Sequence, residues 1–506
     1  MKKAAILLMI ITVFSKVIGF GRDLTLAYFY GASTVSDIYI IAISLPTILF
    51  GIIGMGISTA YIPMYTKLEA RKGKNEADNY TSKLINLVIL ISISLVLIVL
   101  IFTESILKIF ASGFEDNVLE IAISFTRISF ISVFFLSIFY IIQGYLHMKG
   151  KFAIPAMLGI PMSVVTIVSI VISYHTSIYV LIVGNVIASA IQISILIIYA
   201  KKEGFKYKLH VKFFDNNIKT MMHLAFPVMM GSSIIQLSLL IDRTLASRLG
   251  EGAIASLNYA QLIDTFVQGI FVTSIITVLY PLISKYAIDK NIEAIKNKLM
   301  QTFIIICFML SPIMVFVLCF SEEIIKILFN RGAFDQEAVV MSSTALFFYS
   351  FGMIGVAIRF LIMKVFYSLQ DTKTPMINSS ISVSINILLS ILLSYYIGIG
   401  GIALGTSISA IIATYLLYQS LKNKIGSILT KEFYISILKI ILSTIIFIIV
   451  AIFVYNEGGN LVPQNMRLLI TLVISGSCYI LIVYLMKIRS VEDLFYNAKS
   501  KINKEF

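Results

Sequence analysis

Ionisable side chains lie within strongly apolar segments of this 506-residue chain. A charge at the centre of a bilayer costs roughly 2.5–3.5 kcal/mol on insertion scales, so it normally faces a cavity or a partner. Cations outnumber acids among these residues, and arginine can hold a phosphate through two parallel hydrogen bonds. The pattern predicts a cavity for an anionic substrate; ion pairs that hold helices together are the alternative. The residues concerned are Lys16, Arg22, Asp23, Asp37, Arg127, Asp242, Arg243, Asp264 and Arg359.

Three of these charges crowd one segment near the N-terminus. On a helix that turns 100° per residue, Lys16 and Asp23 share a face two turns apart, whereas Arg22 points elsewhere. We therefore expect Asp23 to neutralise Lys16 or to brace a neighbouring helix, and Arg22 to reach the interior of its lobe. Asp37 opens the next apolar segment, where a carboxylate suits a helix N-terminus, so a capping role competes with a role in transport.

Other kinds of catalytic or binding chemistry leave no trace in the sequence. The three cysteines and four histidines are scattered without metal-ligand spacing. No nucleotide-binding glycine loop or nucleophile elbow occurs. We therefore predict a transporter rather than an enzyme, with no ATPase of its own, driven by a gradient or by a partner.

The elements that carry these charges must be membrane helices. Hydrophobic residues make up 58% of the chain and charged residues only 13%, with a mean hydropathy of +0.95. Apolar runs long enough to cross roughly 30 Å of hydrocarbon recur about fourteen times. The first run is too long and too charged for a cleavable signal, so we expect it to be retained. The fold class is an all-α polytopic membrane protein.

The net charge of +14 follows the topology of the chain rather than pointing to nucleic acid. Loops after every second span are rich in lysine, and the alternate loops are short, neutral or partly acidic. This alternation is typical of the positive-inside rule and predicts that both termini are cytoplasmic. The basic rim would also attract anionic lipids.

A duplicated unit underlies the organisation of the chain. The segment Asp23 to Gly31 recurs at Asp242 to Gly250, an offset of 219 residues (242 − 23). The repeats predict two parallel lobes of about six spans each, plus two extra C-terminal helices. The expected boundaries are 1–200 for the N-lobe, 201–220 for a cytoplasmic linker, 221–422 for the C-lobe and 423–506 for the last two spans and a cytoplasmic tail.

Two further expectations follow from the repeats. The stretches that begin at Glu104 and Glu322 are short and mix charge with apolar residues, which predicts helices that lie at the outer interface. Spans 1, 2, 7 and 8 carry the densest charge and are expected to wall a central cavity. Glycines such as Gly54 and Gly56 in span 2 would allow close packing or bending there.

At this point the residues resemble a known family, the MurJ (MviN) lipid II flippases of the MOP exporter superfamily. The resemblance covers roughly residues 5–490 in order. Its motifs are Ser15-Lys16 with Gly21-Arg22-Asp23, Gly31-Ala32 with Ser36-Asp37, Gly144-Tyr145-Leu146 with Gly150-Lys151-Phe152, Leu328-Phe329 with Arg331-Gly332-Ala333-Phe334-Asp335, and, most specifically, Phe366-Tyr367 with Gln370-Asp371-Thr372-Lys373-Thr374-Pro375.

The resemblance implies a function in peptidoglycan biosynthesis. A member of this family would move the undecaprenyl-diphosphate-linked precursor lipid II from the inner to the outer leaflet of the bacterial cytoplasmic membrane by alternating access. Membrane potential or a cation gradient would drive it, with Na⁺ as a possible coupling ion. Lys16 occupies an arginine position of the family pattern, Arg22, Asp23 and Asp37 match directly, and Asp242 and Asn378 are the counterparts of a sodium site. We expect a monomer, with cell-wall polymerases as possible partners.

The chain also departs from the family pattern. Arginines often present in spans 2 and 8 are replaced by Phe50-Gly51 and by the stretch Tyr259 to Leu262. We hypothesise that Arg243 and Arg359 take their place and that Asp264 shares the substrate site. The departures leave open a flippase for another undecaprenyl-linked oligosaccharide, of the O-antigen or capsule type. A cation-coupled drug exporter fits the cationic set less well, and a scaffold for cell-wall synthases would tolerate loss of these charges.

Overall fold

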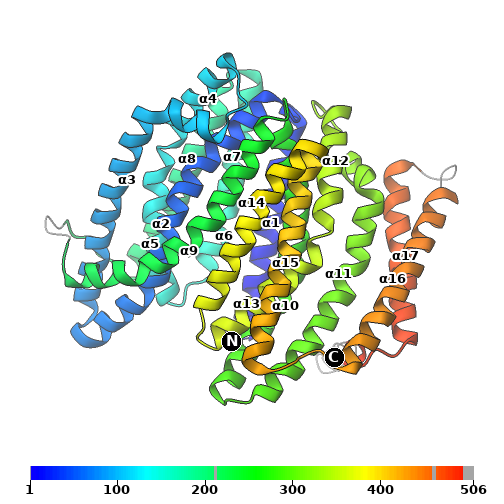
Figure 1. Cartoon of the computed structure of the whole chain (residues 1–506). Coiled ribbons are helices and arrows are strands. Elements are labelled where there is room, and N and C mark those ends of the chain that lie inside the picture. Colours follow the sequence, from blue (N-terminus) through cyan, green and yellow to red (C-terminus); the bar gives the residue numbers. More distant parts are fainter. Residues whose placement is uncertain (1, 210–213, 458–462, 494–506) are drawn as a thin grey trace. The chain divides into compact units, whose positions relative to one another are not determined.

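The computed structural model describes residues 2–209, 214–457 and 463–493 (Figure 1). Within those ranges the chain forms helices joined by loops, without strands, which confirms the all-α class. The predicted cytoplasmic tail beyond residue 493 lies outside the described residues, as does part of the 201–220 linker. The helices are α1 (Lys2–Tyr30), α2 (Thr34–Lys72), α3 (Lys74–Phe110), α4 (Asp116–Ser129), α5 (Ser132–Met148), α6 (Ala153–Met157), α7 (Gly159–His175), α8 (Tyr179–Lys202), α9 (Asn216–Ser247), α10 (Ala253–Ile288), α11 (Ile292–Phe329), α12 (Gln336–Ser350), α13 (Met353–Ser368), α14 (Lys373–Ile397), α15 (Ile399–Ile425), α16 (Lys431–Glu457) and α17 (Gln464–Leu485).

Most of these helices suit a bilayer. In the described residues, 12 helices or continuous helix pairs are long and apolar enough to cross a membrane. The number becomes 13 if α12 and α13, which meet at a 49° bend, form one span. Helix α1 is not among them; it carries Lys16, Arg22 and Asp23. The protein is therefore a multi-pass membrane protein, while the predicted count of fourteen is not confirmed.

The chain divides into two compact units. Unit 1 comprises 1–256 with 329–338, and unit 2 comprises 257–328 with 339–506. Each is described by itself below. The predicted lobe boundaries at 200 and 221 stay a prediction.

In unit 1, glycines of α2 allow close helix packing, as the sequence suggests. A Cβ on Gly54 would lie 2.3 Å from the ring of Tyr140 in α5, and one on Gly56 would lie 2.3 Å from Met229 Cγ in α9. In return, Gly144 of α5 makes room for Tyr61, which is fully buried. Small residues therefore let α2 contact helices on two sides.

The duplication extends to details of backbone shape. Helix α3 departs from helical geometry at Phe102 and α11 does so at Phe320, an offset of 218 residues (320 − 102). Beyond each kink an ion pair one turn apart follows, Lys108 to Glu104 and Lys326 to Glu322, both at 2.6 Å. Both stretches are helical, as expected, and the kinks at Phe102 and Phe320 set them off from the preceding parts of α3 and α11. That they lie at the outer interface stays a prediction.

Unit 2 is held by small and hydroxyl residues together with aromatic rings. A Cβ on Gly401 would lie 2.1 Å from the carbonyl oxygen of Leu393, so α14 and α15 pack in close contact. Thr414 of α15 donates to the carbonyl of Gly355 in α13 at 2.7 Å. Helix α17 joins α11 where the rings of Tyr479 and Phe308 stack with centroids 5.6 Å apart. The two extra C-terminal helices are thus packed against the core of this unit.

Candidate functional site

In α1 the charges pair differently from the sequence expectation. The guanidinium of Arg22 donates to both carboxylate oxygens of Asp23, with Nη2 at 2.8 and 3.0 Å and Nε at 3.0 Å from Oδ1. Asp23 therefore pairs with Arg22 and not with Lys16. That Arg22 reaches the interior of its lobe stays a prediction. A long arginine side chain can fold back over its neighbour, which helical angles for Cβ directions do not capture. Lys16 is half-buried and takes part in no ion pair within the described residues.

Asp37 is a buried helix cap, but for another helix. Its Oδ2 accepts a hydrogen bond from the backbone N–H of Gly252 at 2.8 Å, and its Oδ1 accepts one from Ala255 at 2.7 Å. These N–H groups begin α10 and have no partner inside that helix. Only 2% of Asp37 is exposed. The helix that Asp37 opens is capped instead by Ser33, whose hydroxyl accepts from the backbone N–H of Ser36.

The reverse contact also exists. Glu251, in the loop before α10, accepts a hydrogen bond from the backbone N–H of Thr34 at the start of α2, at 3.0 Å. The hydrogen bonding from Thr34 lowers the pKa of Glu251. The start of α10 is therefore capped by Asp37 of α2, and the start of α2 is held by Ser33 together with Glu251 from the loop before α10. At Gly252 (φ 75°) a Cβ would lie 2.0 Å from the carbonyl oxygen of Ala32, so only glycine fits this close approach.

Two further contacts, related by the repeat, surround these caps. On one side, the backbone N–H of Ala333 donates to the carbonyl of Tyr28 at 2.8 Å, and a Cβ on Gly31 would collide with Ala333. On the other side, the N–H of Gly113 donates to the hydroxyl of Ser247 at 3.1 Å. Thr244 donates to the carbonyl of Phe110 at 3.0 Å, and Arg248 donates to Ser112 at 2.8 Å. We call residues 28–37, 110–113, 244–256 and 331–334 the loop junction.

The loop junction joins segments from both copies of the repeat. Gly113 and Gly332 differ by 219 positions (332 − 113), as do Gly31 and Gly250. The C-terminal end of α3 lies on the end of α9, and the segment after α11 lies on the end of α1. All four loops are ones that the positive-inside pattern places on the same side of the membrane. Within unit 1, end loops from the two copies of the repeat therefore contact one another.

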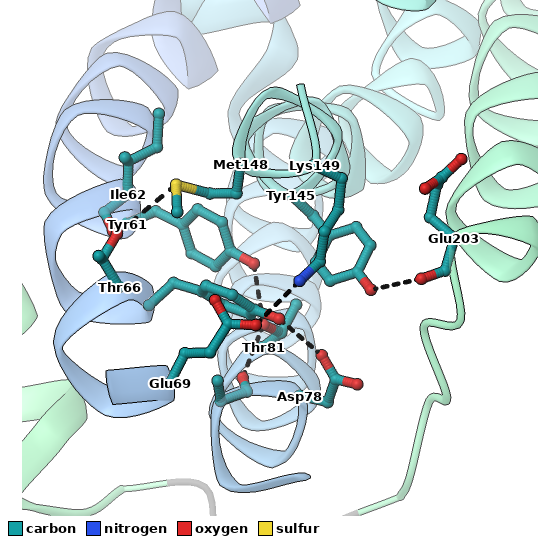
Figure 2. A network of polar contacts seen from close by, with 12 residues as sticks. Tyr61, Ile62, Thr66, Glu69, Asp78, Thr81, Tyr145, Met148, Lys149 and Glu203 are labelled. Carbon is teal, nitrogen blue, oxygen red and sulfur yellow. Dashed lines mark hydrogen bonds and ion pairs between the residues drawn. The ribbon is translucent and has the colours of Figure 1, made fainter. Parts of the chain in front are cut away.

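A second polar cluster, which the sequence did not indicate, ties α2, α3 and α5 together (Figure 2). The hydroxyl of Tyr65 donates to Asp78 Oδ1 at 3.0 Å, and Lys149 Nζ donates to Glu69 at 2.9 Å. Lys149 also lies over the rings of Tyr65 and Tyr145, 5.4 and 5.6 Å from their centroids. Its position among mostly buried side chains indicates that it holds the helix ends together.

The remaining predicted residues of unit 1 lie on α9. Asp242 is buried and Arg243 half-buried. The repeat places Asp242 opposite Asp23, but here the arginine, Arg243, follows the acid, and Ile241 precedes it.

In unit 2 the predicted charges lie on α10 and α13. Asp264 is half-buried and accepts a hydrogen bond from Gln268 one turn later, whose Nε2 donates to the carbonyl of Met353 at 2.9 Å. Asp264 Oδ1 has no hydrogen-bond partner in the described part of the chain. Arg359 is half-buried on α13, stacks beside the ring of Phe360 and leaves its Nε without a partner. No described carboxylate forms an ion pair with Arg359.

The two residues assigned to a sodium site fall in different units. Asp242 belongs to unit 1 and Asn378 to unit 2. Asn378 is buried on α14 and donates to the carbonyl of Thr374 at 2.9 Å and to the hydroxyl of Ser420 at 3.2 Å. No cluster of three or more acids, histidines or cysteines suited to a metal ion occurs in the described residues. The sodium assignment stays a prediction.

Sequence reasoning overlooked the acid that completes the loop junction. Glu251 lies between Gly250 and Gly252 in a loop and carries no helical pattern. The repeat offset places Ser256 opposite Asp37, so comparing the copies does not reveal a second acid. The sequence signal that could have found it is the pair of glycines on either side, Gly250 and Gly252, because glycines in a loop often mark a tight approach of two backbones. In the structure both glycines have positive φ.

A family model described as Lipid II flippase MurJ matches residues 26–466, which is most of the chain. This match decides the family. The chain belongs to the MurJ lipid II flippase family. It is therefore a transporter and not an enzyme.

Relatives within the MurJ family cover the chain almost end to end. A probable lipid II flippase MurJ of Buchnera aphidicola subsp. Baizongia pistaciae is 28% identical over 83% of this chain and 83% of its own length. The protein of that name in Thermotoga maritima is 26% identical over 96% of both chains. A solved lipid II flippase MurJ in an inward closed conformation is 27% identical, covers 97% of this chain and 100% of its own, and superposes with a TM-score of 0.83.

A more distant likeness places the fold in a wider group. An inward-facing multidrug resistance MATE family transporter of the MOP superfamily matches 84% of this chain with a TM-score of 0.66. Its identity is only 15%, so it shows the fold alone. The expected MOP superfamily membership agrees with this neighbour.

The MurJ-family departure in α2 is a packed apolar site. Phe50 is fully buried, and its ring lies 6.4 Å from that of Tyr140 in α5. A Cβ on Gly51 would face Gln236 of α9 at 3.8 Å. Where the resemblance leads us to expect an arginine, this chain therefore has aromatic packing. In α10, Gln261 is half-buried where the family often has the second arginine.

Proposed function

We propose that this protein moves the diphosphate-linked head group of lipid II from the inner to the outer leaflet of the bacterial cytoplasmic membrane. The match along 26–466 supports the substrate, because the curated relatives are named as probable lipid II flippases. Arg359 is the observation in this chain that carries the chemistry. A half-buried guanidinium on a membrane helix without a described carboxylate partner is costly unless an anion arrives.

The substrate's charge fits the cations that remain available. A diphosphate offers several acceptor oxygens, and a guanidinium can hold two of them at once. Arg359 is in no ion pair within the described chain, so it is proposed to contact the diphosphate. The predicted contact of Lys16 with the substrate stays a prediction. Arg22 already holds Asp23, so we expect it to contribute less attraction and more positioning. The lipid tail of the substrate can stay in the bilayer.

Alternating access would require the loop junction to open. The acid caps from Asp37 and Glu251 and the contacts of Gly31 and Gly113 close the side that the positive-inside pattern makes external. We propose that the head group enters while these contacts are made and leaves when they break. Both termini would then be cytoplasmic.

The driving force is proposed to be the membrane potential or a cation gradient. A charge that crosses the full field is worth about 2.3 kcal/mol per 100 mV, which suffices for a slow cycle. Na⁺ is the candidate coupling ion, with Asp242 and Asn378 as proposed participants. Replacing Na⁺ by K⁺ in a reconstituted assay should slow transport if Na⁺ is coupled; an unchanged rate would leave the potential as the driver.

A second candidate function has one specific observation in its favour. Phe50 and Gly51 replace a cationic position of the family with packed apolar contacts. A flippase for another undecaprenyl-linked oligosaccharide would keep the diphosphate but need different contacts to the sugar. The two candidates share Arg359 and differ in the glycan carried.

The test is complementation with a matched arginine control. A bacterial host is depleted of its own lipid II flippase and supplied with this protein, and growth and outer-leaflet lipid II are scored together. Losing hydrogen bonds to a charged group costs about 1.5–3 kcal/mol, so Arg359→Gln should lower transport roughly tenfold to a hundredfold. Arg71→Gln removes an exposed arginine in the last turn of α2 and should behave as the parent does.

The outcomes separate the two candidates. Rescue of growth and lipid II export by the parent chain, lost in Arg359→Gln and kept in Arg71→Gln, supports the proposal. No rescue by an inserted, abundant parent chain would refute lipid II as the substrate and direct the assay to other undecaprenyl-linked glycans. Full activity of Arg359→Gln would refute the assigned role of that residue.

A further inference from the structure

A large apolar cavity lies inside unit 1, away from the charged residues discussed above. Its volume is about 670 Å³, within the range of roughly 300–1,000 Å³ typical of small-molecule sites. Residues of α2 and α3 form two of its walls, and residues from the first turns of α9 form the third. Its lining includes Ile57, Leu84, Val88, Ile91, Met222 and Phe226.

The local sequence places α9 across this cavity. Asp215 caps the helix by accepting from the N–H groups of Asn217 and Ile218 at 3.0 and 2.9 Å. Lys83 of α3 binds the other oxygen of Asp215 at 2.9 Å and so fixes the start of α9 to α3. The first turns then run at a steep angle to the rest of the helix, which contains Pro227 (Figure 1).

The cavity has a basic rim. Lys219 and His223 are its ionisable lining residues, and they lie one turn apart on the same face of α9. Neither forms an ion pair with a described acid, and the nearby Asp215 is already occupied by Lys83 and the helix cap. A single apolar cavity with uncompensated positive charge at its edge favours a ligand with an anionic head and a hydrocarbon chain.

The preceding segment brings more positive charge to the same place. The backbone N–H of Lys208 donates to Ser82 of α3 at 3.2 Å, and the Tyr207 hydroxyl donates to Asn86. These contacts hold the exposed side chains of Lys206 and Lys208 beside α3. The segment thus adds to the basic rim rather than screening it.

The surface around the cavity suits the membrane interface. Phe214, Leu224 and Phe226 are 62%, 51% and 61% exposed, next to exposed Lys219 and His223. A helix that mixes exposed aromatic and basic residues in this way typically lies at the boundary of head groups and acyl chains. We therefore expect the cavity to open toward the lipid of the membrane.

We propose that this cavity binds one acyl chain of an anionic glycerophospholipid, with the lipid phosphate held by Lys219 and His223. The apolar lining offers no partner for a polar head, so the head must stay at the basic rim. The methionines Met221, Met222 and Met229 allow the walls to adapt to chains of different length. By joining α9 to α2 and α3, the lipid would stabilise the bent start of α9. This site is independent of the transported substrate and does not rest on the proposed function.

The test uses the full-length purified protein in nanodiscs or detergent, with phosphatidylglycerol as the probe and phosphatidylcholine as the neutral comparison. Bound lipid is measured by native mass spectrometry. Lys219→Gln should weaken phosphatidylglycerol binding about fivefold, since one basic residue near a lipid surface contributes about that factor. The matched control is Lys422→Gln, an exposed lysine in the last turn of α15.

A second pair of variants tests the chain pocket without touching charge. Ile91→Trp fills the cavity from α3 and should abolish the preference for phosphatidylglycerol, whereas Leu97→Trp, at a position 54% exposed on the same helix, should keep it. Equal binding of both phospholipids, or binding unaffected by Ile91→Trp, would overturn the proposal. So would displacement of phosphatidylglycerol by undecaprenyl phosphate at equal concentration, which would assign the cavity to the substrate's tail.

Discussion

Removing the carboxylate of Asp37 should open the loop junction. In Asp37→Ala, the backbone N–H groups of Gly252 and Ala255 lose their hydrogen-bond acceptor. The site is buried, since only 2% of Asp37 is exposed to solvent. Loss of a helix cap costs about 0.5–2 kcal/mol, and a buried donor left unsatisfied costs about 1–3 kcal/mol. Part of these costs overlaps, so we expect roughly 2–4 kcal/mol against the closed junction. The open population should therefore rise about 30-fold to 1,000-fold.

Thiol accessibility measures this shift directly. Ser256 is fully buried in the loop junction, and its hydroxyl has no hydrogen-bond partner in the described chain. Ser256→Cys should therefore report the accessibility of the junction with little effect on its stability. The native Cys307, Cys319 and Cys478 are first replaced by alanine. A membrane-impermeant maleimide added outside intact cells should label Cys at 256 faster in Asp37→Ala than in the parent.

The control and the refuting result are equally specific. Glu120→Gln removes an exposed acid of α4 and should leave the labelling rate unchanged. Asp37→Asn keeps one acceptor oxygen and should give an intermediate rate. If Asp37→Ala is inserted and folded but labels at the parental rate, the caps do not hold the junction closed and the reasoning fails.

The other predictions concern stability. Gly31→Ala adds a Cβ 2.3 Å from the carbonyl oxygen of Ala333 at φ 60°, whereas the Cβ of Gly73→Ala at φ 82° meets nothing within 4 Å. In thermal unfolding, Gly31→Ala should therefore lose more stability than the roughly 1–2 kcal/mol that left-handed strain alone costs. Equal losses in the two variants would contradict the close approach. Tyr65→Phe leaves the buried carboxylate of Asp78 without its hydrogen-bond donor, so it should lower the free energy of unfolding by about 1–3 kcal/mol in chemical denaturation. Tyr396→Phe, at an exposed position, should have no measurable effect. Equal stability of the two variants would refute the role of the Tyr65–Asp78 hydrogen bond. Hydrogen bonds from Lys424 and Thr374 lower the pKa of Asp371 to about 2. The stability that the ionised Asp371 contributes is therefore fully present above the ordinary pKa of about 4 and is lost as the pH falls toward about 2. The difference in melting temperature between the parent and Asp371→Asn should shrink over that pH range. A constant difference would argue against the ion pair.

The asymmetry between the two repeats bears on how the junction works. Asp37 has Ser256 as its repeat counterpart, and the second acid, Glu251, comes from a loop position five residues earlier (256 − 251). The two caps are therefore similar in effect but unequal in burial, since Asp37 is buried and Glu251 is exposed. We expect substitutions of Glu251 to open the junction less than those of Asp37, because water can replace its oxygen at Thr34.

The membrane class, the duplication and the family could all be predicted from the sequence. Hydropathy is a local property that a run of residues carries by itself, and the offset of 219 positions needs no coordinates. The repeat even anticipated matched backbone features, since the kinks at Phe102 and Phe320 follow it. The chemistry of Asp37 as a helix cap was also within reach, because a carboxylate near helix N-termini is a general preference.

Only the tertiary structure decided which groups meet. Helical angles placed Asp23 with Lys16, but side-chain length allowed Arg22 to take the carboxylate instead. Asp37 caps α10 and not its own helix, because segments 215 residues apart approach within hydrogen-bond distance. The cavity beneath α9 likewise depends on a bend and on contacts from three helices. Spacing along the chain fixes which face a residue shares, whereas partners across helices depend on packing distances that no local pattern encodes.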